Sequence, residues 1–586
     1  MPESNAAPSY PALDIPLKST IARFTHGISP AAVTAAMLDW WTHLAVSPGK
    51  QLALTESAWN KWLRLMMAMQ ECAAGQASSC VPAAAHDKRF DHPAWRDEPF
   101  HLASQAFLLW EQWWQEAAAG VRGVSAHDEQ VASFVMRQMT DVLSPSNQIS
   151  GNPEVLQATL AAGGKNLLHG AANWWRDYMA VLTDGRPKDA EKFTPGATVA
   201  VTPGKVVLRN RLIELIQYAP TTPHVHPEPV LIVPSWIMKY YILDLSPRNS
   251  LVKYLVDRGH TVFMISWRNP GPDDRELAME DYVQQGVMAA LRAVQQAMPR
   301  EHSRGHVHAM GYCLGGTLLT MAAAALARDG RSPLATMTLL AAQTDFEEPG
   351  ELGLFIDESQ IAFLEDVMAE RGYLDGRQMA GAFALINSKD LVWSKLVHEY
   401  LMGAQTPLND LRAWNADATR MPARMHGEYL RRLYLHNELA EGSFVVGGAP
   451  VVLRDIRVPT YVVATERDHV SPWRSVFKIH RLSDAPLRFV LSSGGHNVGI
   501  VNPPDGPAAS KSASFRVAER SVRNNHAEPQ AWADAAEQHA GSWWPDWAAW
   551  LAAHSTRKVT PPPFGGKGTK RLPVLDNAPG RYVHET

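Results

Sequence analysis

The feature of this 586-residue chain that most limits its fold is a series of short β-branched and aliphatic runs after about residue 198. Most of these runs are separated by segments that are long enough to form a helix. This alternation is typical of a doubly wound, mostly parallel sheet that is covered by helices. The runs are Val230–Val233, Thr261–Ile265, Val307–Met310, Thr336–Leu340, Thr460–Ala464 and Leu487–Leu491.

The other parts of the chain have different compositions. Residues 1–195 carry apolar residues at helical spacing and many tryptophans, so we predict a helical N-terminal region before a catalytic domain at 196–555. The tryptophans either pack helix on helix or form a surface for a hydrophobic partner or polymer. Residues 347–455 interrupt the strand–helix rhythm and predict a helical lid insertion. Residues 556–586 are rich in proline, glycine and basic side chains, and we expect a loose tail there.

The strongest local motif is Gly311-Tyr312-Cys313-Leu314-Gly315, between a predicted strand and a predicted helix. This is the nucleophile-elbow pattern, with cysteine in the place of serine. The nucleophile of such a turn has a strained backbone, and the glycines let strand and helix approach without a Cβ clash. The N-terminus of the following helix also favours a thiolate. We therefore predict an α/β-hydrolase-like fold with Cys313 as the nucleophile; a buried structural cysteine is the alternative.

An acid and a base are expected after later strands, in that order. Asp468 follows the predicted strand that ends at Ala464, and His496 lies in a glycine-rich loop after the next strand. We predict that Cys313, Asp468 and His496 form the catalytic set. Asp345, which follows an earlier strand, remains the alternative acid.

Acyl transfer to a cysteine also requires two N–H donors for the oxyanion of the tetrahedral intermediate. We expect one donor to be the backbone N–H of Leu314, directly after the nucleophile. The second is expected from the segment Pro234–Lys239 after an early strand, with Ile237 or Trp236 as the donor. Simple packing of this segment at the sheet edge is the alternative.

A cysteine nucleophile favours one class of reaction over another. An acyl group that moves from a thioester to a thiol remains a thioester, so it keeps its activation for a later transfer to a hydroxyl. We therefore favour thioester-to-hydroxyl acyl transfer, provided that the lid excludes water. A cysteine-dependent hydrolase or thioesterase, with water as the acceptor, is the alternative.

Composition excludes several other classes of protein. The net charge of −4, from 55 basic and 59 acidic residues, gives no indication of nucleic-acid binding. Three cysteines, Cys72, Cys80 and Cys313, make no disulfide scaffold and indicate a reducing compartment. The first residues lack the basic and apolar regions of a signal peptide. The longest nearly apolar stretch, Leu314–Ala327, is too short to span a membrane.

Three motifs of the chain resemble the polyhydroxyalkanoate synthases, most of all the class I type with one kind of subunit. They are Gly311-Tyr-Cys-Leu-Gly-Gly316, Glu466-Arg-Asp-His-Val-Ser-Pro-Trp473 and Gly494-Gly-His-Asn-Val-Gly-Ile-Val-Asn-Pro-Pro504. The resemblance covers nearly the whole chain, because other stretches are similar to the N-terminal, lid and C-terminal regions of the family: 87–95, 143–147 with 152–154, 414–419 and 542–547. By these motifs, the nucleophile, aspartate and histidine of the family fall on Cys313, Asp468 and His496.

The resemblance implies 3-hydroxyacyl-CoA as the substrate, and a polyester such as poly-3-hydroxybutyrate and free CoA as the products. It implies that His496 deprotonates Cys313, while Asp468 supports the histidine and activates the 3-hydroxyl of the substrate. It also implies no metal or other cofactor and a cytoplasmic enzyme at polyester granules, which we expect to be a homodimer when active. The alternative from another class is a granule-associated structural protein with a vestigial site.

This sequence departs from the family pattern in its early loop. The family usually has Ile-Asn-Lys where this chain has Ile237-Met238-Lys239. The loss of that amide puts the donor geometry and the specific activity in question and is consistent with a divergent branch. The phosphates of CoA need basic contacts, and the lid position of Arg424, Arg431 and Arg432 makes them candidates, with a solvated helix face as the alternative.

Overall fold

The computed structural model describes residues 11–25, 27–73, 81, 87–182, 189–298, 305–376, 378–379, 381, 388–520, 528–569 and 571–586. The first ten residues, on which the signal-peptide prediction depends, and Cys80 lie outside the described residues. The chain divides into two compact units. The sheet unit comprises Met1–His26, Lys188–Ala380 and Leu408–Thr586, and the helical unit comprises Gly27–Pro187 and Gly381–Pro407. The segment predicted as a lid, 347–455, is therefore shared between the two units.

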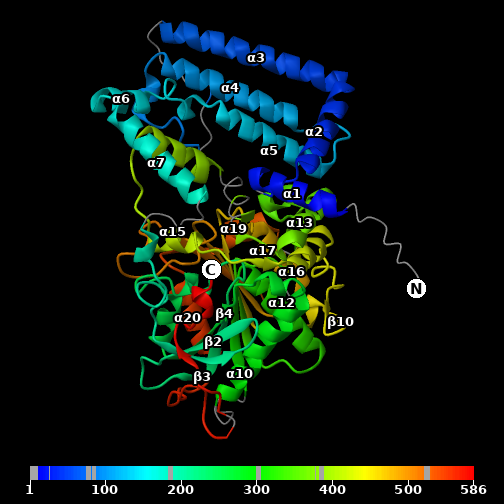
Figure 1. Ribbon diagram of the computed structural model, residues 1–586, viewed down its shortest axis with the longest axis vertical. Helices are drawn as coiled ribbons and strands as arrows, with labels where there is room; N and C mark the ends of the chain where they lie inside the picture. The colour runs from blue at the N-terminus through cyan, green and yellow to red at the C-terminus, as the bar shows by residue number, and fades with distance from the viewer. Residues whose placement is uncertain are drawn as a thin grey trace, which may run out of the picture. The chain divides into compact units, whose positions relative to one another are not determined.

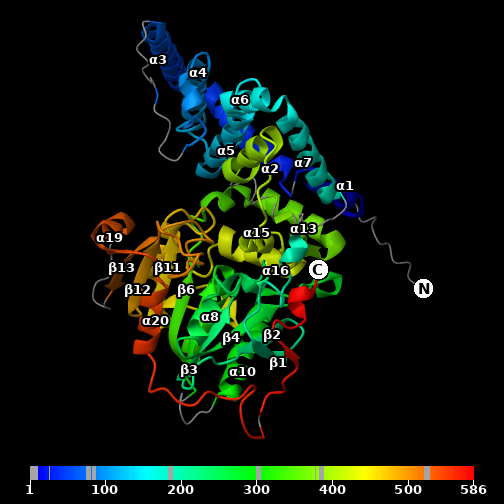
Figure 2. The same ribbon diagram turned by 90° about the vertical axis from the view of Figure 1, so that its left-hand side faces the viewer.

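The described residues of the sheet unit form an eleven-stranded sheet in the order β14-β13-β12-β11-β6-β5-β3-β4-β2-β1-β15. Figure 1 labels β2, β3 and β4 of this sheet, and Figure 2 labels strands from β13 at one side to β1 at the other. The central strands from β12 to β4 pair in parallel, and the strands outside them pair antiparallel. This arrangement confirms the mostly parallel sheet that the sequence predicts. The strands are β1 (Gly204–Arg209), β2 (Ile213–Tyr218), β3 (His226–Val233), β4 (His260–Trp267), β5 (Val307–Tyr312), β6 (Leu334–Leu340), β11 (Thr460–Thr465), β12 (Leu487–Ser492), β13 (Ser514–Arg520), β14 (Glu537–Ala540) and β15 (Asp576–Asn577).

The central strands are rich in apolar residues because both faces of the sheet are covered. Every residue of β3, β4, β5 and β11 is buried. Helices pack against these strands: α12 contacts β5, α8 contacts β4, and α10 contacts β3. The helices of the unit include α1 (Pro11–Thr25), α8 (Leu251–Val256), α10 (Ala289–Ala297), α12 (Leu314–Arg328), α13 (Glu358–Arg371), α15 (Asp410–Asn415), α16 (Ala423–Glu428), α17 (Trp473–Phe477), α18 (Ile479–Leu482), α19 (Pro529–Ala535), α20 (Trp544–Ala553) and the π-helical η6 (Tyr282–Met288) and η10 (Tyr429–Leu435).

The expectation of a loose tail after residue 555 is wrong. Val559 pairs with Val225 through backbone bonds, and β15 pairs antiparallel with β1. The side chain of Glu228 accepts hydrogen bonds from the backbone and hydroxyl of Thr556. The segment therefore follows the edge and end of the sheet, where backbone pairing and the side chain of Glu228 hold it.

The helical unit is built from amphipathic helices, two of which begin with a capping side chain and a proline. Ser29 caps α2 and Asn152 caps α6, in each case with proline at the first helical position. Near the end of the unit, Asn166 and Asn173 of α7 donate to the carbonyls of Leu401 and Glu399 in the 381–407 segment. The helices are α2 (Pro30–Ala45), α3 (Pro48–Ala73), α4 (Phe100–Ala118), α5 (Ala126–Val142), α6 (Pro153–Ala162), α7 (Lys165–Leu182) and the π-helical η8 (Lys389–Trp393) and η9 (Leu396–Leu401).

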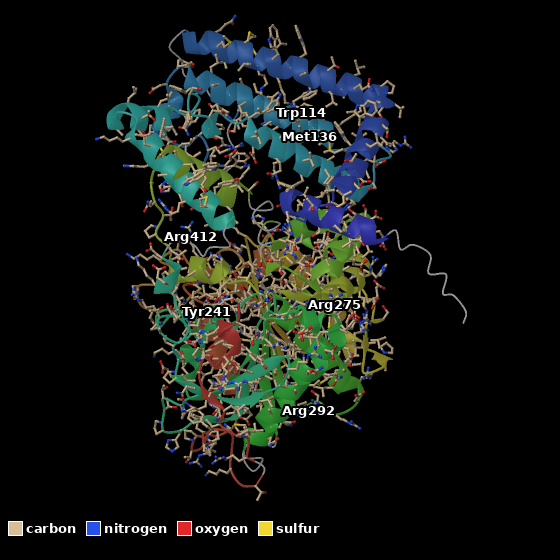
Figure 3. The ribbon with its side chains drawn as sticks, viewed as in Figure 1. Trp114, Met136, Tyr241, Arg275, Arg292 and Arg412 are labelled. Atoms are coloured by element: carbon tan, nitrogen blue, oxygen red, sulfur yellow. The ribbon has the colours of Figure 1, made fainter. Side chains whose placement is uncertain are left out.

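The tryptophans of the helical unit divide between the two interpretations that the sequence left open. Trp40 is buried in a small core with Met136, and Trp114 packs against that core (Figure 3). A second group is exposed to solvent, which a purely structural role does not require. This exposed group comprises Trp41, Trp59, Trp62, Trp110, Trp174 and Trp175.

A buried cluster of charges also lies in the helical unit. The guanidinium of Arg89 forms ion pairs with Asp87 at 2.6 Å, Glu111 at 2.8 Å and Asp141 at 3.0 Å. Burial would raise the pKa of Asp87, but its hydrogen bonds and charge interaction with Arg89 hold that pKa below its usual value. Burial raises the pKa of Asp141. One guanidinium thus pairs with three carboxyl groups that would otherwise be costly to bury.

Candidate functional site

Cys313 lies at a sharp turn between β5 and α12. Its backbone has φ +52° and ψ −127°, a conformation that L-amino acids rarely adopt. Its N–H donates to the carbonyl of Leu340 on the neighbouring strand β6 at 2.8 Å, and its carbonyl accepts from Gly316 at 2.8 Å. These bonds hold the strained residue in place, as the predicted nucleophile elbow requires.

The glycines of the motif are explained by contacts of the backbone. A Cβ on Gly311 would lie 2.3 Å from the Cα of Gly316, and a Cβ on Gly315 would lie 2.2 Å from the carbonyl oxygen of Val233. A Cβ on Gly316 would lie 2.4 Å from the Cβ of Ala342. Strand β5, helix α12 and the end of β3 therefore approach more closely than any side chain allows.

The predicted base and acid are joined at the carboxyl end of the neighbouring strands. Nδ1 of His496 lies 2.8 Å from Oδ2 of Asp468, which is buried. The carboxylate of Asp468 also accepts hydrogen bonds from the Thr465 hydroxyl and from the N–H groups of Val470 and Ser471. The aspartate is thus fixed from three sides, so that it orients the imidazole and keeps a proton on Nδ1.

The charges of this group change the ionisation of its members. Burial alone would lower the pKa of His496, but the negative charges of Asp468 and Cys313 and hydrogen bonds to both raise it well above 6.5. Burial alone would raise the pKa of Asp468, but the charge of His496 and its hydrogen bonds lower it below 3.8. The structure therefore brings the three predicted residues into one interacting set.

Residues beside the set orient it further. The hydroxyl of Tyr312 donates to Oδ1 of Asn497 at 2.7 Å, and the rings of Tyr312 and His496 lie 5.6 Å apart. Two lid tyrosines, Tyr429 and Tyr434, are bonded to each other at 2.9 Å through their hydroxyls. Burial is the main cause that raises the pKa of both, and the nearby charge of Cys313 adds to it. The interaction with Tyr434 raises the pKa of Tyr429 further, whereas the hydrogen bond with Tyr429 acts to lower that of Tyr434. None of these four residues was predicted from the sequence, although Tyr312 and Asn497 directly adjoin the predicted nucleophile and base.

The alternative acid and the candidate phosphate ligands have other partners. Asp345 accepts a hydrogen bond from the N–H of Glu347 and lies 3.5 Å from Lys478. Each of the three lid arginines forms an ion pair with glutamate: Arg424 with Glu428, Arg431 with Glu358 and Glu365, and Arg432 with Glu438. These pairs match the interpretation of a charged helix surface better than that of phosphate ligands.

The predicted oxyanion donors lie at the same edge of the sheet. Leu314 is the first residue of α12, where N–H groups have no partner within the helix. The loop Pro234–Lys239 follows β3, which is the parallel neighbour of β5. In this loop the N–H of Ile237 lies 3.5 Å from Oγ of Ser235, too far for a strong hydrogen bond. Trp236 is buried, and its carbonyl accepts from the hydroxyl of Thr419 at 2.5 Å.

The whole chain is similar to known proteins. A family described as "Poly-beta-hydroxybutyrate polymerase (PhaC) N-terminus" matches residues 86–255, and one described as "alpha/beta hydrolase fold" matches residues 228–503. A poly(3-hydroxyalkanoate) polymerase of Methylorubrum extorquens is 42% identical over 500 residues, which are 85% of this chain and 80% of that protein. The chain belongs to the poly(3-hydroxyalkanoate) polymerase family.

Other relatives of the poly(3-hydroxyalkanoate) polymerase family match still more of the chain. The "Poly(3-hydroxyalkanoate) polymerase subunit PhaC" of Cupriavidus necator is 38% identical over 93% of this chain and 90% of its own length. Among solved structures, a monoacylglycerol lipase of Paleococcus ferrophilus aligns with 58% of this chain and 99% of its own, at 11% identity and a TM-score of 0.31.

Two further observations concern this member of the poly(3-hydroxyalkanoate) polymerase family. Among its described helices, none is both long and apolar enough to cross a bilayer. In the described part of the chain, His, Cys, Asp and Glu side chains form no group of three or more that could hold a metal ion. The prediction that no cofactor is needed stays a prediction.

Proposed function

We propose that this chain polymerises 3-hydroxyacyl groups from CoA thioesters into a polyester through a covalent acyl-Cys313 intermediate. Membership of the polymerase family supports the overall reaction, which is an acyl transfer. The observation that carries the proposed intermediate is the joint placement of Cys313 at the strained turn and of His496 against both Cys313 and Asp468.

The first step transfers the acyl group to the enzyme. Nε2 of His496 takes the thiol proton of Cys313, and the sulfur forms a bond to the thioester carbonyl carbon. The negative charge moves to the carbonyl oxygen, where the N–H of Leu314 and an N–H of the loop Pro234–Lys239 stabilise it. When the tetrahedral intermediate collapses, the bond to the CoA sulfur breaks, and His496 returns the proton to that sulfur.

The second step extends the polymer. The 3-hydroxyl of the growing chain or of the next monomer gives its proton to His496, and its oxygen attacks the acyl carbon on Cys313. An ester bond forms, the bond to Cys313 breaks, and the thiol recovers its proton. Because a thioester is more activated than an ester, this transfer is downhill. Asp468 holds the proton on Nδ1 of His496 throughout, so that Nε2 is always the reacting nitrogen.

The exposed aromatic side chains of the helical unit support a further part of the proposal. Trp59 and Trp62 stack at a centroid distance of 4.9 Å, and Trp174 stacks with Tyr178 at 5.3 Å, all largely exposed. Such side chains suit contact with an apolar polymer surface. We therefore propose that this unit attaches the enzyme to its polyester granule. Replacement of Trp59 and Trp62 by serine should weaken co-sedimentation with granules, whereas serine at the buried Trp40 should mainly lower stability.

We also propose that the active enzyme is a homodimer, as the family resemblance suggests. Mass photometry of the enzyme before and during elongation tests this part. A purely monomeric enzyme that elongates at the full rate would refute it.

The test of the central proposal is incubation of the purified protein with 3-hydroxybutyryl-CoA while thiol release and turbidity are recorded together. We expect both signals to rise in the wild type and both to vanish in Cys313→Ala. Release of CoA with free 3-hydroxybutyrate and no polymer would instead identify a thioesterase. Polymer formation by Cys313→Ala would refute the covalent intermediate.

A further inference from the structure

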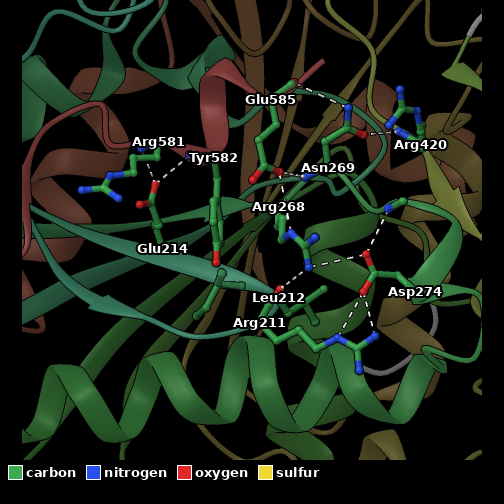
Figure 4. A network of polar contacts seen from close by, with 12 residues as sticks. Arg211, Leu212, Glu214, Arg268, Asn269, Asp274, Arg420, Arg581, Tyr582 and Glu585 are labelled. Carbon is green, nitrogen blue, oxygen red and sulfur yellow. Dashed lines mark hydrogen bonds and ion pairs between the residues drawn. The ribbon is translucent and has the colours of Figure 1, made fainter.

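The segment 576–586 is fastened to the edge of the sheet unit through a buried carboxylate (Figure 4). Glu214 on β2 accepts hydrogen bonds from the N–H groups of Arg581 at 2.8 Å and Tyr582 at 3.0 Å. Gly580 has φ +85°, and a Cβ there would lie 2.3 Å from Oε2 of Glu214. The hydroxyl of Tyr582 donates to the carbonyl of Asn210 at 2.6 Å. The path of this segment is therefore fixed by specific bonds, since a buried carboxylate requires its donors.

The fastened segment reaches the loop that carries a predicted oxyanion donor. Nζ of Lys239, the last residue of the loop Pro234–Lys239, donates to the carbonyl of Tyr582 at 3.3 Å and to the carbonyl of Glu585. Lys239 is only 3% exposed. A buried ammonium must be held by acceptors, so these two carbonyls restrict where the loop can lie.

The same segment also reaches the base of the lid. The N–H of Asn269 donates to Oε2 of Glu585 at 3.1 Å, and Oδ1 of Asn269 accepts from the N–H of Arg420 at 2.9 Å. The guanidinium of Arg420 donates to the carbonyl of Thr586 at 3.1 Å. Figure 4 shows Asn269 between Glu585 and Arg420. Segment 576–586 therefore contacts both the strand end after β4 and the lid residues that follow α15.

Those lid residues hold the other side of the loop. The N–H of Thr419 donates to the carbonyl of Ile237 at 3.2 Å, and Met238 forms an isolated β-bridge with Ala418. The indole N–H of Trp414 donates to the carbonyl of Lys239 at 2.7 Å. The loop Pro234–Lys239 is thus held on one side by lid residues 414–419 and on the other side by segment 576–586, which Lys239 contacts.

We propose that residues 576–586 act as a clamp that positions the loop Pro234–Lys239 for binding the oxyanion, with Lys239 and Glu585 as positioning residues. The proposal rests on the acyl-Cys313 mechanism proposed above. Among the described residues, no hydrogen bond or ion pair given above joins the clamp to Cys313 or His496. We therefore expect the clamp to affect the tetrahedral intermediate and not the nucleophile. Within the loop, the N–H of Ile237 makes only a long hydrogen bond, at 3.5 Å to Oγ of Ser235. Its direction is therefore set by the contacts that hold the loop on its two sides.

The test compares two reactions of Cys313 in the full-length chain. Single-turnover release of CoA from 3-hydroxybutyryl-CoA passes through an oxyanion, whereas alkylation by iodoacetamide does not. We expect Lys239→Met to slow CoA release by about tenfold or more while alkylation changes by less than about twofold, because only the first reaction needs the donor. Glu585→Ala removes the half-buried carboxylate that accepts from the N–H of Asn269, and it should slow CoA release in the same selective way.

The matched control is His584→Ala, which removes an exposed side chain from the same segment. We expect it to leave both reactions unchanged. Hydrogen–deuterium exchange of the peptide 234–240 gives a second readout, and it should be faster in Lys239→Met and Glu585→Ala but not in the control.

Three results would overturn the clamp. They are CoA release at the wild-type rate in both Lys239→Met and Glu585→Ala, a parallel fall of both reactions, and unchanged exchange of peptide 234–240. Failure of the acyl-enzyme mechanism itself gives a different result. In that case, replacement of Cys313 would not change the release of CoA. In that case the exchange measurement still decides whether the segment restrains the loop.

Discussion

Substitution of Gly311 by alanine should disable the enzyme through geometry alone. The new Cβ would lie 2.3 Å from the Cα of Gly316, 2.6 Å from its nitrogen and 2.8 Å from the carbonyl oxygen of Gly315. Ordinary contact begins at 3.4 Å, so strand β5 and helix α12 must separate by about 1 Å. All three atoms belong to the backbone, so no side chain can rotate to relieve the clash.

The expected effect follows from where the displacement occurs. Cys313 joins the two elements, so a shift of about 1 Å moves its sulfur relative to His496 and should lower single-turnover CoA release by about 100-fold. The strain should also lower the free energy of unfolding by about 1–3 kcal/mol, measured by urea titration. Gly271→Ala is the control, because nothing lies within 4 Å of a Cβ at that position. Gly311→Ala with wild-type CoA release and stability would refute the close-approach argument.

Three other changes test the chemistry and the buried charges. Cys313→Ser should nearly abolish polymer formation in the turbidity assay, because an ester intermediate lacks the activation of a thioester; elongation at the wild-type rate would contradict this. Asp468→Asn should lower the pKa of His496, measured by NMR, because the charge and hydrogen bond of Asp468 then no longer oppose the effect of burial and only those of Cys313 still do. Since the raised pKa of the wild type stabilises the folded state fully below pH 6.5, the stability difference between wild type and variant should narrow as pH rises through the folded pKa. Arg89→Met should destabilise the helical unit by about 3–5 kcal/mol at neutral pH, and by less in acid where the freed carboxyls protonate; equal urea midpoints for variant and wild type would exclude the role of this cluster.

The elbow and its partners could be predicted because their signals are local. Glycines on either side of Cys313 report a close backbone approach, and Asp468 and His496 each follow a strand whose residues are recognisably β-forming. Parallel strands bring such positions to one edge of the sheet, so the topology alone implies that the three residues meet. The choice between Asp468 and Asp345 needed coordinates, because both follow strands that lie next to each other in the sheet.

The path of the segment 576–586 could not be predicted from the sequence. Its composition instead predicted a loose tail. Proline and glycine are equally frequent in loose tails and in segments that follow a surface closely. The path of the segment is fixed by long-range hydrogen bonds, such as those that the N–H groups of Arg581 and Tyr582 donate to Glu214. No local sequence pattern indicates these bonds. The division of the lid between the two units was hidden for the same reason, because Asn166 and Asn173 meet it only in the folded chain.

The most direct test of the account is mass spectrometry of the protein after rapid acid quenching with 3-hydroxybutyryl-CoA. The mechanism predicts that the peptide containing Cys313 gains the mass of one or more 3-hydroxybutyryl units, and that the increase disappears after treatment with neutral hydroxylamine, which cleaves thioesters. An acyl group on any other residue, or polymer formation without modification of Cys313, would contradict it.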